Sequence, residues 1–237
     1  MIDKQRPDWN ATIQGMFSRI SRHYDLLNTL MSLGRDRHWR KFVLKYAAVP
    51  PDGSLLDVGA GTGKIALEAK STYQDIRVTA LDLTPDMMKV GKAQAGGGDI
   101  LWINGDALEL PFRDQSFDAV TSGFLMRNAP DVKKAFQEQF RVVQPGGRVI
   151  CLDTCPPKYH VMKPLIYLYF KIGITFLGGM VSRQWDAYRY LPESIQAFKT
   201  PQELAGVMES AGFANVTYRR FMFDTVAIVI GERPPAA

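Results

Sequence analysis

A glycine-rich turn is the first feature of the sequence that suggests chemistry. The segment 57–63 reads Asp-Val-Gly-Ala-Gly-Thr-Gly and leads into a helical pattern that opens at Lys64. Glycines let the backbone turn tightly and approach a ligand, and the N-terminus of a following helix supplies free N–H donors. The dinucleotide fingerprint G-x-G-x-x-G needs a third glycine where Lys64 stands, so a pyrophosphate-binding dehydrogenase is disfavoured. The turn alone predicts a ligand site without naming the ligand.

Two carboxylates follow apolar runs further along the chain. Asp82 ends one such run, and Asp106 comes shortly after the next. If these runs are parallel strands, their carboxyl ends meet at one edge of a sheet, beside the glycine turn. A carboxylate at this edge can accept both hydroxyl groups of a ribose. The alternative is that Asp82 only caps the helix that follows it.

Arg127 and Asn128 form the third candidate group. A fixed guanidinium can stabilise negative charge on a ligand oxygen. The alternative is a loop arginine held in a salt bridge. The three histidines and the pair Cys151 and Cys155 lack the spacing of a four-ligand zinc site, so we expect no metal.

The elements that must position these residues can be read from the hydrophobic pattern. Apolar residues at helical spacing over 10–47 predict two helices broken near Gly34, and after residue 53 short apolar runs alternate with helical stretches. This alternation predicts a doubly wound α/β fold with ligands at the carboxyl ends of its strands. The expected strands are 55–58, 78–81, 100–103, 117–120 and 149–152, the expected helices are 63–71, 85–95, 131–143 and about 201–211, and 214–218 with 225–230 is expected to form a closing hairpin.

One apolar insertion interrupts the pattern at 159–181. Lysines, glycines and a proline break it, so it falls short of a transmembrane span, and a lid or interfacial helix over an apolar ligand fits better. We therefore expect an N-terminal helical cap at 1–50 and one ligand-binding domain at 51–237, with a helical lid inserted at about 156–198.

Composition and charge limit the class of protein. With 46% hydrophobic and 22% charged residues among 237, the chain is not of the disordered type. The net charge of +5 lies in residues 1–50, which hold nine Lys and Arg against four Asp and Glu. An anionic membrane surface or a nucleic acid could use this patch, but a solvated helix face explains it equally simply, and the aromatic-basic interleaving of RNA-binding modules is lacking. Two cysteines and no apolar N-terminal run predict a cytoplasmic protein.

The spacing Asp-x-Gly-x-Gly-x-Gly, followed by Asp82, Asp106-Ala107 and Pro145-Gly146-Gly147, resembles the class I S-adenosylmethionine (SAM) methyltransferases. The resemblance implies a Rossmann-like, mostly parallel seven-stranded sheet with helices on both faces and an antiparallel C-terminal strand. It also implies SAM as cofactor. The implied cofactor-binding residues are Asp57, Gly59, Ala60, Gly61, Thr62, Asp82, Leu83, Asp106, Ala107, Ser122 and Gly123.

Four further segments narrow the resemblance, and they cover most of the chain. Together they are similar to the ubiquinone/menaquinone biosynthesis C-methyltransferases, with departures at Leu27 (Met in the family), Gly123 (commonly Ser) and Asp153 (usually Glu). The segments are 24–32 followed by His38-Trp39, 124–128, 141–148 and 188–195.

The narrower resemblance implies transfer of a methyl group to a ring carbon of a polyprenylated quinol. Arg127, Asn128, Tyr24 and Asp25 are the implied catalytic residues. It also implies peripheral contact with an anionic membrane and no nucleic-acid partner, while a homodimer and the choice between a benzoquinol and a naphthoquinol ring stay open. Two alternatives also stay open: methylation of another hydrophobic small molecule, and a non-catalytic SAM-binding scaffold of a quinone-biosynthesis complex.

Overall fold

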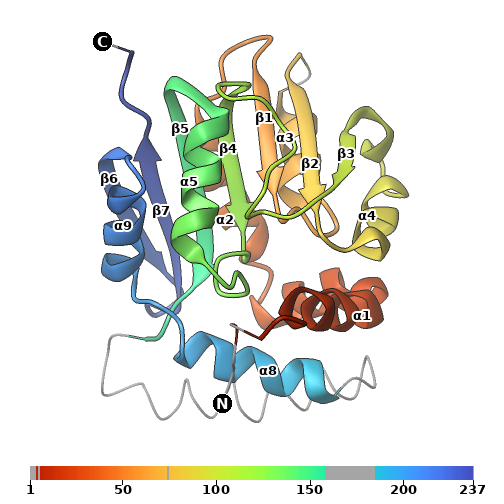
Figure 1. The fold of residues 1–237 in the computed structure, drawn as a ribbon. Coiled ribbons are helices and arrows are strands. Elements are labelled where there is room, and N and C mark those ends of the chain that lie inside the picture. The colour runs from red at the N-terminus through yellow and green to blue at the C-terminus, as the bar shows by residue number, and fades with distance from the viewer. Residues whose placement is uncertain (1–3, 5, 74, 158–184, 237) are drawn as a thin grey trace.

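The computed structural model describes residues 4, 6–73, 75–157 and 185–236, and its centre is one twisted sheet (Figure 1). The described strands pair in the order β3-β2-β1-β4-β5-β7-β6. The first five in this order are parallel, and β7 is antiparallel to both β5 and β6. Their bounds are β1 Ser54–Val58, β2 Arg77–Asp82, β3 Leu101–Asn104, β4 Phe117–Gly123, β5 Val143–Thr154, β6 Ala214–Phe221 and β7 Val226–Glu232.

Helices cover both faces of the sheet because successive strand residues point to opposite sides. Leu56 and Val58 of β1 pack with α5 and α9, whereas Leu55 packs with α2 and α3. The expected doubly wound α/β fold with an antiparallel C-terminal strand is therefore confirmed. The described helices are α1 Trp9–Met31, α2 Asp36–Ala47, α3 Lys64–Thr72, α4 Pro85–Lys92, α5 Val132–Val142, α8 Trp185–Gln196 and α9 Pro201–Ser210.

The N-terminal helices take two different positions. The chain leaves α1 through Leu33 and Gly34, both at positive φ, as the expected break near Gly34 requires. The apolar side of α2 enters the sheet core with Trp39, Val43 and Leu44. In contrast, α1 lies across the carboxyl ends of the parallel strands, with α8 beside it (Figure 1). These two helices cover the edge of the sheet where a doubly wound fold binds its ligands.

The start of β5 differs from the expectation. The expected strand at 149–152 lies within β5, but β5 begins earlier, at Val143, so Pro145-Gly146-Gly147 lies inside the strand and not before it. The register between β4 and β5 jumps from Phe117↔Val143 to Ala119↔Arg148, so the glycines lie inside the strand as an irregularity. A Cβ on Gly147 would lie 2.6 Å from the carbonyl oxygen of Asp118, which explains a glycine at this close approach.

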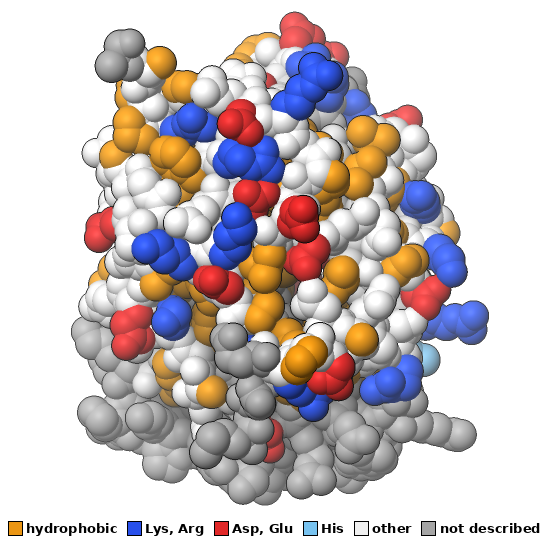
Figure 2. Space-filling view, viewed as in Figure 1, with side chains coloured by type: hydrophobic (Ala, Val, Ile, Leu, Met, Phe, Trp, Pro, Cys, Tyr) orange, Lys and Arg blue, Asp and Glu red, His pale blue; other side chains and the backbone are white. Residues whose placement is uncertain are grey.

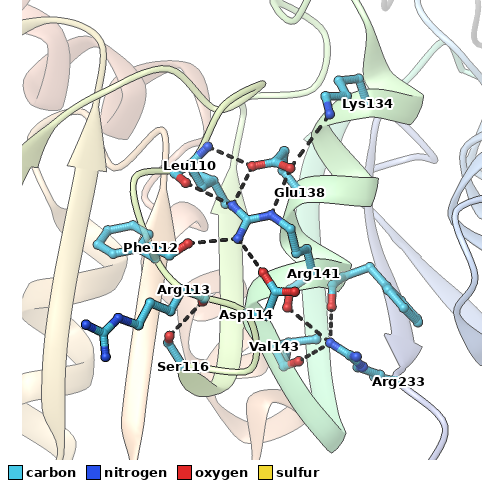
Figure 3. A network of polar contacts seen from close by, with 11 residues as sticks. Leu110, Phe112, Arg113, Asp114, Ser116, Lys134, Glu138, Arg141, Val143 and Arg233 are labelled. Atoms are coloured by element: carbon cyan, nitrogen blue, oxygen red, sulfur yellow. Dashed lines mark hydrogen bonds and ion pairs between the residues drawn. The ribbon is translucent and has the colours of Figure 1, made fainter.

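A polar network fixes the loop between β3 and β4 against α5 (Figure 3). The guanidinium of Arg141 donates to the carbonyls of Leu110 and Phe112 at 2.9 and 2.8 Å and pairs with Glu138 at 2.7 Å. Glu138 in turn accepts the N–H of Leu110 at 2.8 Å. Because this loop begins at Asp106, the network holds one wall of the site described below.

The apolar insertion at 159–181 lies outside the described residues. The expected lid at about 156–198 is wider, and its later part forms α8. Within the described chain, no helix is both long and apolar enough to cross a bilayer. On the face shown in Figure 2, the described acidic and basic side chains are interspersed, and no single sign of charge dominates. Among the basic residues of α2, Arg37, Lys41 and Lys45 are exposed.

Candidate functional site

Three neighbouring cavities open beneath α1, at the carboxyl ends of the parallel strands. The first, of about 720 Å³, contains Asp82 and Asp106; the second, of about 570 Å³, contains Asp57 and the glycine turn. The third, of about 530 Å³, contains Arg127. Phe124 lines all three, so the three cavities adjoin one another at this residue.

The glycine turn separates β1 from α3 and adopts a conformation that favours glycine. Gly59, Gly61 and Gly63 have φ of +66°, +58° and +74°. A Cβ on Gly63 would lie 2.4 Å from the ring of Trp102, and one on Gly59 would lie 2.7 Å from Leu125. The turn is therefore held against its neighbours on both sides, while its backbone lines the first and second cavities.

Asp82, at the end of β2, supports this turn directly. Its Oδ2 accepts the N–H of Gly61 at 2.7 Å, and its Oδ1 accepts the N–H of Thr84 at 2.7 Å. Burial raises the pKa of this carboxyl above its usual value, although the two backbone hydrogen bonds oppose the shift. Each carboxylate oxygen has a second lone pair, so Asp82 can hold the turn and still accept two ligand hydroxyls.

The N-terminal helix reaches the same cavity with polar side chains. Asn10 donates from Nδ2 to Oδ2 of Asp106 at 2.7 Å, and Gln14 donates to the carbonyl of Leu83 at 2.9 Å. Ser18 donates to the carboxylate of Asp86. The sequence analysis missed these residues, although their spacing of four places them on one helix face and was a readable signal.

Asp25 fastens the later part of α1 to the glycine turn. Its Oδ1 accepts the hydroxyl of Thr62 at 2.5 Å, and its Oδ2 lies 3.0 Å from the ammonium of Lys64. Asp25 was expected among the catalytic residues, and it lines the second cavity. In this structure its carboxylate is already occupied by the turn, so it acts as a clamp between α1 and α3.

Asp57 brings to the second cavity a buried carboxylate with one oxygen unpartnered in the described chain. It is 1% exposed; Oδ1 accepts the hydroxyl of Thr121 at 3.0 Å, and Oδ2 has no hydrogen-bond partner among the described residues. Burial raises the pKa of this carboxyl to about 7, although hydrogen bonds from the Thr121 hydroxyl and the Ala66 backbone oppose the shift. A buried acceptor of this kind favours a cationic ligand group.

Arg127 occurs in a buried ion pair. Its Nη1 lies 3.2 Å from Oδ1 of Asp153 and donates to the carbonyl of Phe124 at 2.9 Å, while its backbone N–H donates to Oδ2 of Asp153 at 3.1 Å. Its Nε is buried without a partner in the described chain. The salt-bridge alternative is thus realised, and the Nε–H of the guanidinium has no acceptor among the described residues.

Asn128 holds the loop after β4 in place. Its Nδ2 donates to the carbonyl of Phe124 at 3.1 Å, and its Oδ1 accepts the hydroxyl of Tyr190 in α8 at 2.9 Å. The indole N–H of Trp9 donates to its backbone carbonyl at 2.8 Å. Phe124 itself has φ +57°, a conformation that L-residues rarely adopt, so the loop depends on these contacts.

The remaining predicted site residues lie close together, with one exception. Tyr24 lines the first and second cavities, and burial raises the pKa of its phenol. Ser122 is fully buried in β4 and lines none of these three cavities. The other predicted cofactor-binding residues that line the first or second cavity are Ala60, Thr62, Leu83, Ala107 and Gly123.

The described chain contains no cluster of three potential metal ligands, and burial raises the pKa of the Cys155 thiol to about 12.

Comparison with solved structures agrees with this architecture. The chain matches a SAM-dependent methyltransferase, a possible histamine N-methyltransferase, from Thermotoga maritima with a TM-score of 0.64, at 16% identity and over 92% of this chain and 99% of that one. It also matches phosphoethanolamine N-methyltransferase 2 of Haemonchus contortus in complex with SAM, with a TM-score of 0.60 at 17% identity, over 83% of this chain and 52% of that one. At these identities the likeness establishes the fold alone.

Comparison of sequences is more specific. The chain is 40% identical to a ubiquinone/menaquinone biosynthesis C-methyltransferase of Desulfotalea psychrophila, over 93% of this chain and 90% of the relative. It is 41% identical to a demethylmenaquinone methyltransferase of Thermus thermophilus, over 92% of this chain and 100% of the relative. A model described as the ubiE/COQ5 methyltransferase family matches residues 4–233. This protein therefore belongs to the ubiE/COQ5 methyltransferase family.

Proposed function

We propose that this protein transfers the methyl group of SAM to a ring carbon of a polyprenylated quinol precursor in quinone biosynthesis. The observation that carries the proposal is that the three cavities adjoin one another at Phe124, because cofactor and acceptor must meet at one point for the methyl group to pass between them. The names of the two bacterial relatives supply the class of acceptor.

The residues of the first and second cavities fit SAM by their chemistry. Oδ2 of Asp57 is a buried acceptor without a partner among the described residues, which suits the ammonium group of the methionine part. The spare lone pairs of Asp82 suit the ribose hydroxyls, and Asp106 lies in the same cavity for the adenine amino group. When bound, SAM supplies a methyl group already activated by its sulfonium.

The third cavity suits an apolar acceptor with a polar ring. Its wall is mostly hydrophobic, and Arg127 is its buried cation. The Nε–H of Arg127 can donate to a ring oxygen, and its positive charge favours the ionised form of that oxygen, which makes the adjacent carbon nucleophilic. The apolar wall residues are Met31, Trp39, Phe124, Leu191, Ile195, Met222 and Val226.

Asp153 and Asn128 then act as positioning residues. Asp153 fixes Arg127 through one contact to its guanidinium and one to its backbone N–H, and Asn128 fixes the loop that carries it. Tyr24 lies between the first two cavities and faces both, so its ring helps to exclude water from the transfer. Because the acceptor resides in the bilayer, we also propose peripheral, salt-sensitive contact with anionic membranes through the exposed cations of α2.

Mass spectrometry of the lipid quinones in a strain lacking this gene tests the proposal. We expect accumulation of a quinone that lacks one ring methyl group, restored by the wild-type gene. The head group of that quinone distinguishes a benzoquinol from a naphthoquinol acceptor. An unchanged quinone profile would contradict the proposal and favour another hydrophobic acceptor.

A further inference from the structure

Arg40 is a basic residue of α2 whose side chain is withdrawn from solvent. It belongs to the basic segment 1–50, but its side chain is only 14% exposed. Its Nη1 pairs with Oδ2 of Asp36 at 2.7 Å, and Asp36 is held in turn by the hydroxyl of Ser32 at 2.9 Å. The guanidinium is therefore fixed on one side by its own helix.

The hydrogen bonding of this guanidinium is incomplete at its Nε atom. The Nε of Arg40 is buried and has no hydrogen-bond partner among the described residues. A buried N–H of a charged group without an acceptor is unfavourable, because it has lost its water and gained nothing in return. Arg40 lines the second cavity, so an anionic ligand group bound in that cavity would supply the missing acceptor.

The same cavity contains the complementary charge. Asp57 lines it with a buried carboxylate oxygen that also lacks a partner in the described chain. An acid and a base that line one cavity and each keep one polar atom unpartnered among the described residues match a ligand that carries an ammonium and a carboxylate together, as the α-amino acid end of SAM does.

We propose that Arg40 binds the carboxylate of the methionine part of SAM through its Nε–H, while Asp57 binds the ammonium group. This inference rests on the proposed function, since it assigns a residue to the cofactor named there. Asp36 and Ser32 are positioning residues that aim the guanidinium.

Lys64 is the competing cation at this cavity. Its ammonium already lies 3.0 Å from the carboxylate of Asp25 and donates to the side-chain oxygen of Gln94 at 2.7 Å, and it is 38% exposed. Water and these partners satisfy Lys64, whereas Arg40 keeps a buried donor unsatisfied. The ligand carboxylate therefore gains more from Arg40.

Calorimetry with two ligands tests the assignment on the full-length protein. One ligand is S-adenosylhomocysteine, and the other is its amine analogue, in which hydrogen replaces the carboxylate. For Arg40→Met we expect the affinity for S-adenosylhomocysteine to fall about 10–100-fold, and the affinity for the analogue to change less than about threefold. Arg37→Met removes the same charge from an exposed position of α2 and is expected to change neither.

Arg40→Lys keeps the charge but loses the fork of donors, and it serves as the second variant if Arg40→Met does not fold, which thermal unfolding reports. For Arg40→Lys, too, we expect the affinity for S-adenosylhomocysteine to fall more than the affinity for the analogue. An equal loss for both ligands would overturn the inference and leave Arg40 a structural residue. The inference would also be overturned if Lys64→Met lost the preference for S-adenosylhomocysteine over the analogue while the Arg40 variants kept it. If the wild type binds neither ligand, the proposed function fails; if it binds both equally well, only this inference fails.

Discussion

Replacing Asp57 with asparagine should make the protein more stable at alkaline pH while weakening cofactor binding. Burial raises the pKa of this carboxyl to about 7 from the usual Asp value of 3.8. The folded protein therefore holds a proton on Asp57 that the unfolded chain releases, and the wild type loses stability as the pH rises from about 4 to 7. Above pH 7 both states are ionised, and the loss is complete.

The magnitude follows from the difference between the two pKa values. Between pH 5 and pH 8 the wild type loses about 3 kcal/mol of unfolding free energy through this group. Asp57→Asn cannot ionise, so its stability relative to the wild type should rise by the same amount over that range. The substitution places a buried amide NH₂ group where Oδ2 accepted no hydrogen bond from the described residues, and a buried donor left without an acceptor costs about 1–3 kcal/mol independently of pH.

Urea denaturation of both proteins at pH 5 and pH 8 measures this difference, with Asp75→Asn as a control at an exposed position. At pH 8, the affinity of Asp57→Asn for S-adenosylhomocysteine should fall about 10–100-fold, because the ligand ammonium loses its ionised partner. A stability difference that does not change with pH would refute the raised pKa of Asp57. Unchanged binding would refute its assignment to the ammonium group.

Three further predictions concern other parts of the site. Asp82→Ala should lose roughly 2–3 kcal/mol of SAM affinity in calorimetry, because it removes the acceptor for ligand hydroxyls and the support of the glycine turn; unchanged affinity would exclude it from the ribose site. Arg127→Met should lower the free energy of unfolding by about 3–5 kcal/mol, because it leaves Asp153 buried without its cation. The double variant Arg127→Met with Asp153→Leu should recover much of that stability, but its turnover should stay about a hundredfold below that of the wild type. Asp25→Ala should speed the release of S-adenosylhomocysteine in stopped-flow displacement, because it frees α1 from Thr62; an unchanged rate would show that this clamp does not limit release.

The fold could be read from the sequence because its signals are local. Alternating short apolar runs and helical stretches predict buried parallel strands with crossover helices, and the structure has them. The break near Gly34 and the turn at 59–63 depend on backbone conformations that favour glycine. The start of β5 could not be read, because its irregularity is set by pairing with β4 and not by its own residues.

The composition of the site was also largely predictable, whereas the partners of its residues were not. Asp153 meets Arg127 across 26 positions of sequence, and Asn10 meets Asp106 across 96. Such pairs exist only after the sheet has formed, so neither residue type nor spacing announces them. Arg40 shows the same limit, since only packing distinguishes its buried guanidinium from the exposed cations beside it on α2.

Methyl transfer by the purified protein tests the account most directly. The protein would be incubated with SAM carrying a deuterated methyl group and with short-chain prenylated demethylated naphthoquinol and benzoquinol, and the products would be analysed by mass spectrometry. The account predicts that one labelled methyl group enters a ring carbon of at least one of these quinols, and that Arg127→Met abolishes most of this transfer while the protein still binds SAM. Labelling of an oxygen instead, or binding of SAM without any transfer to either ring, would contradict it.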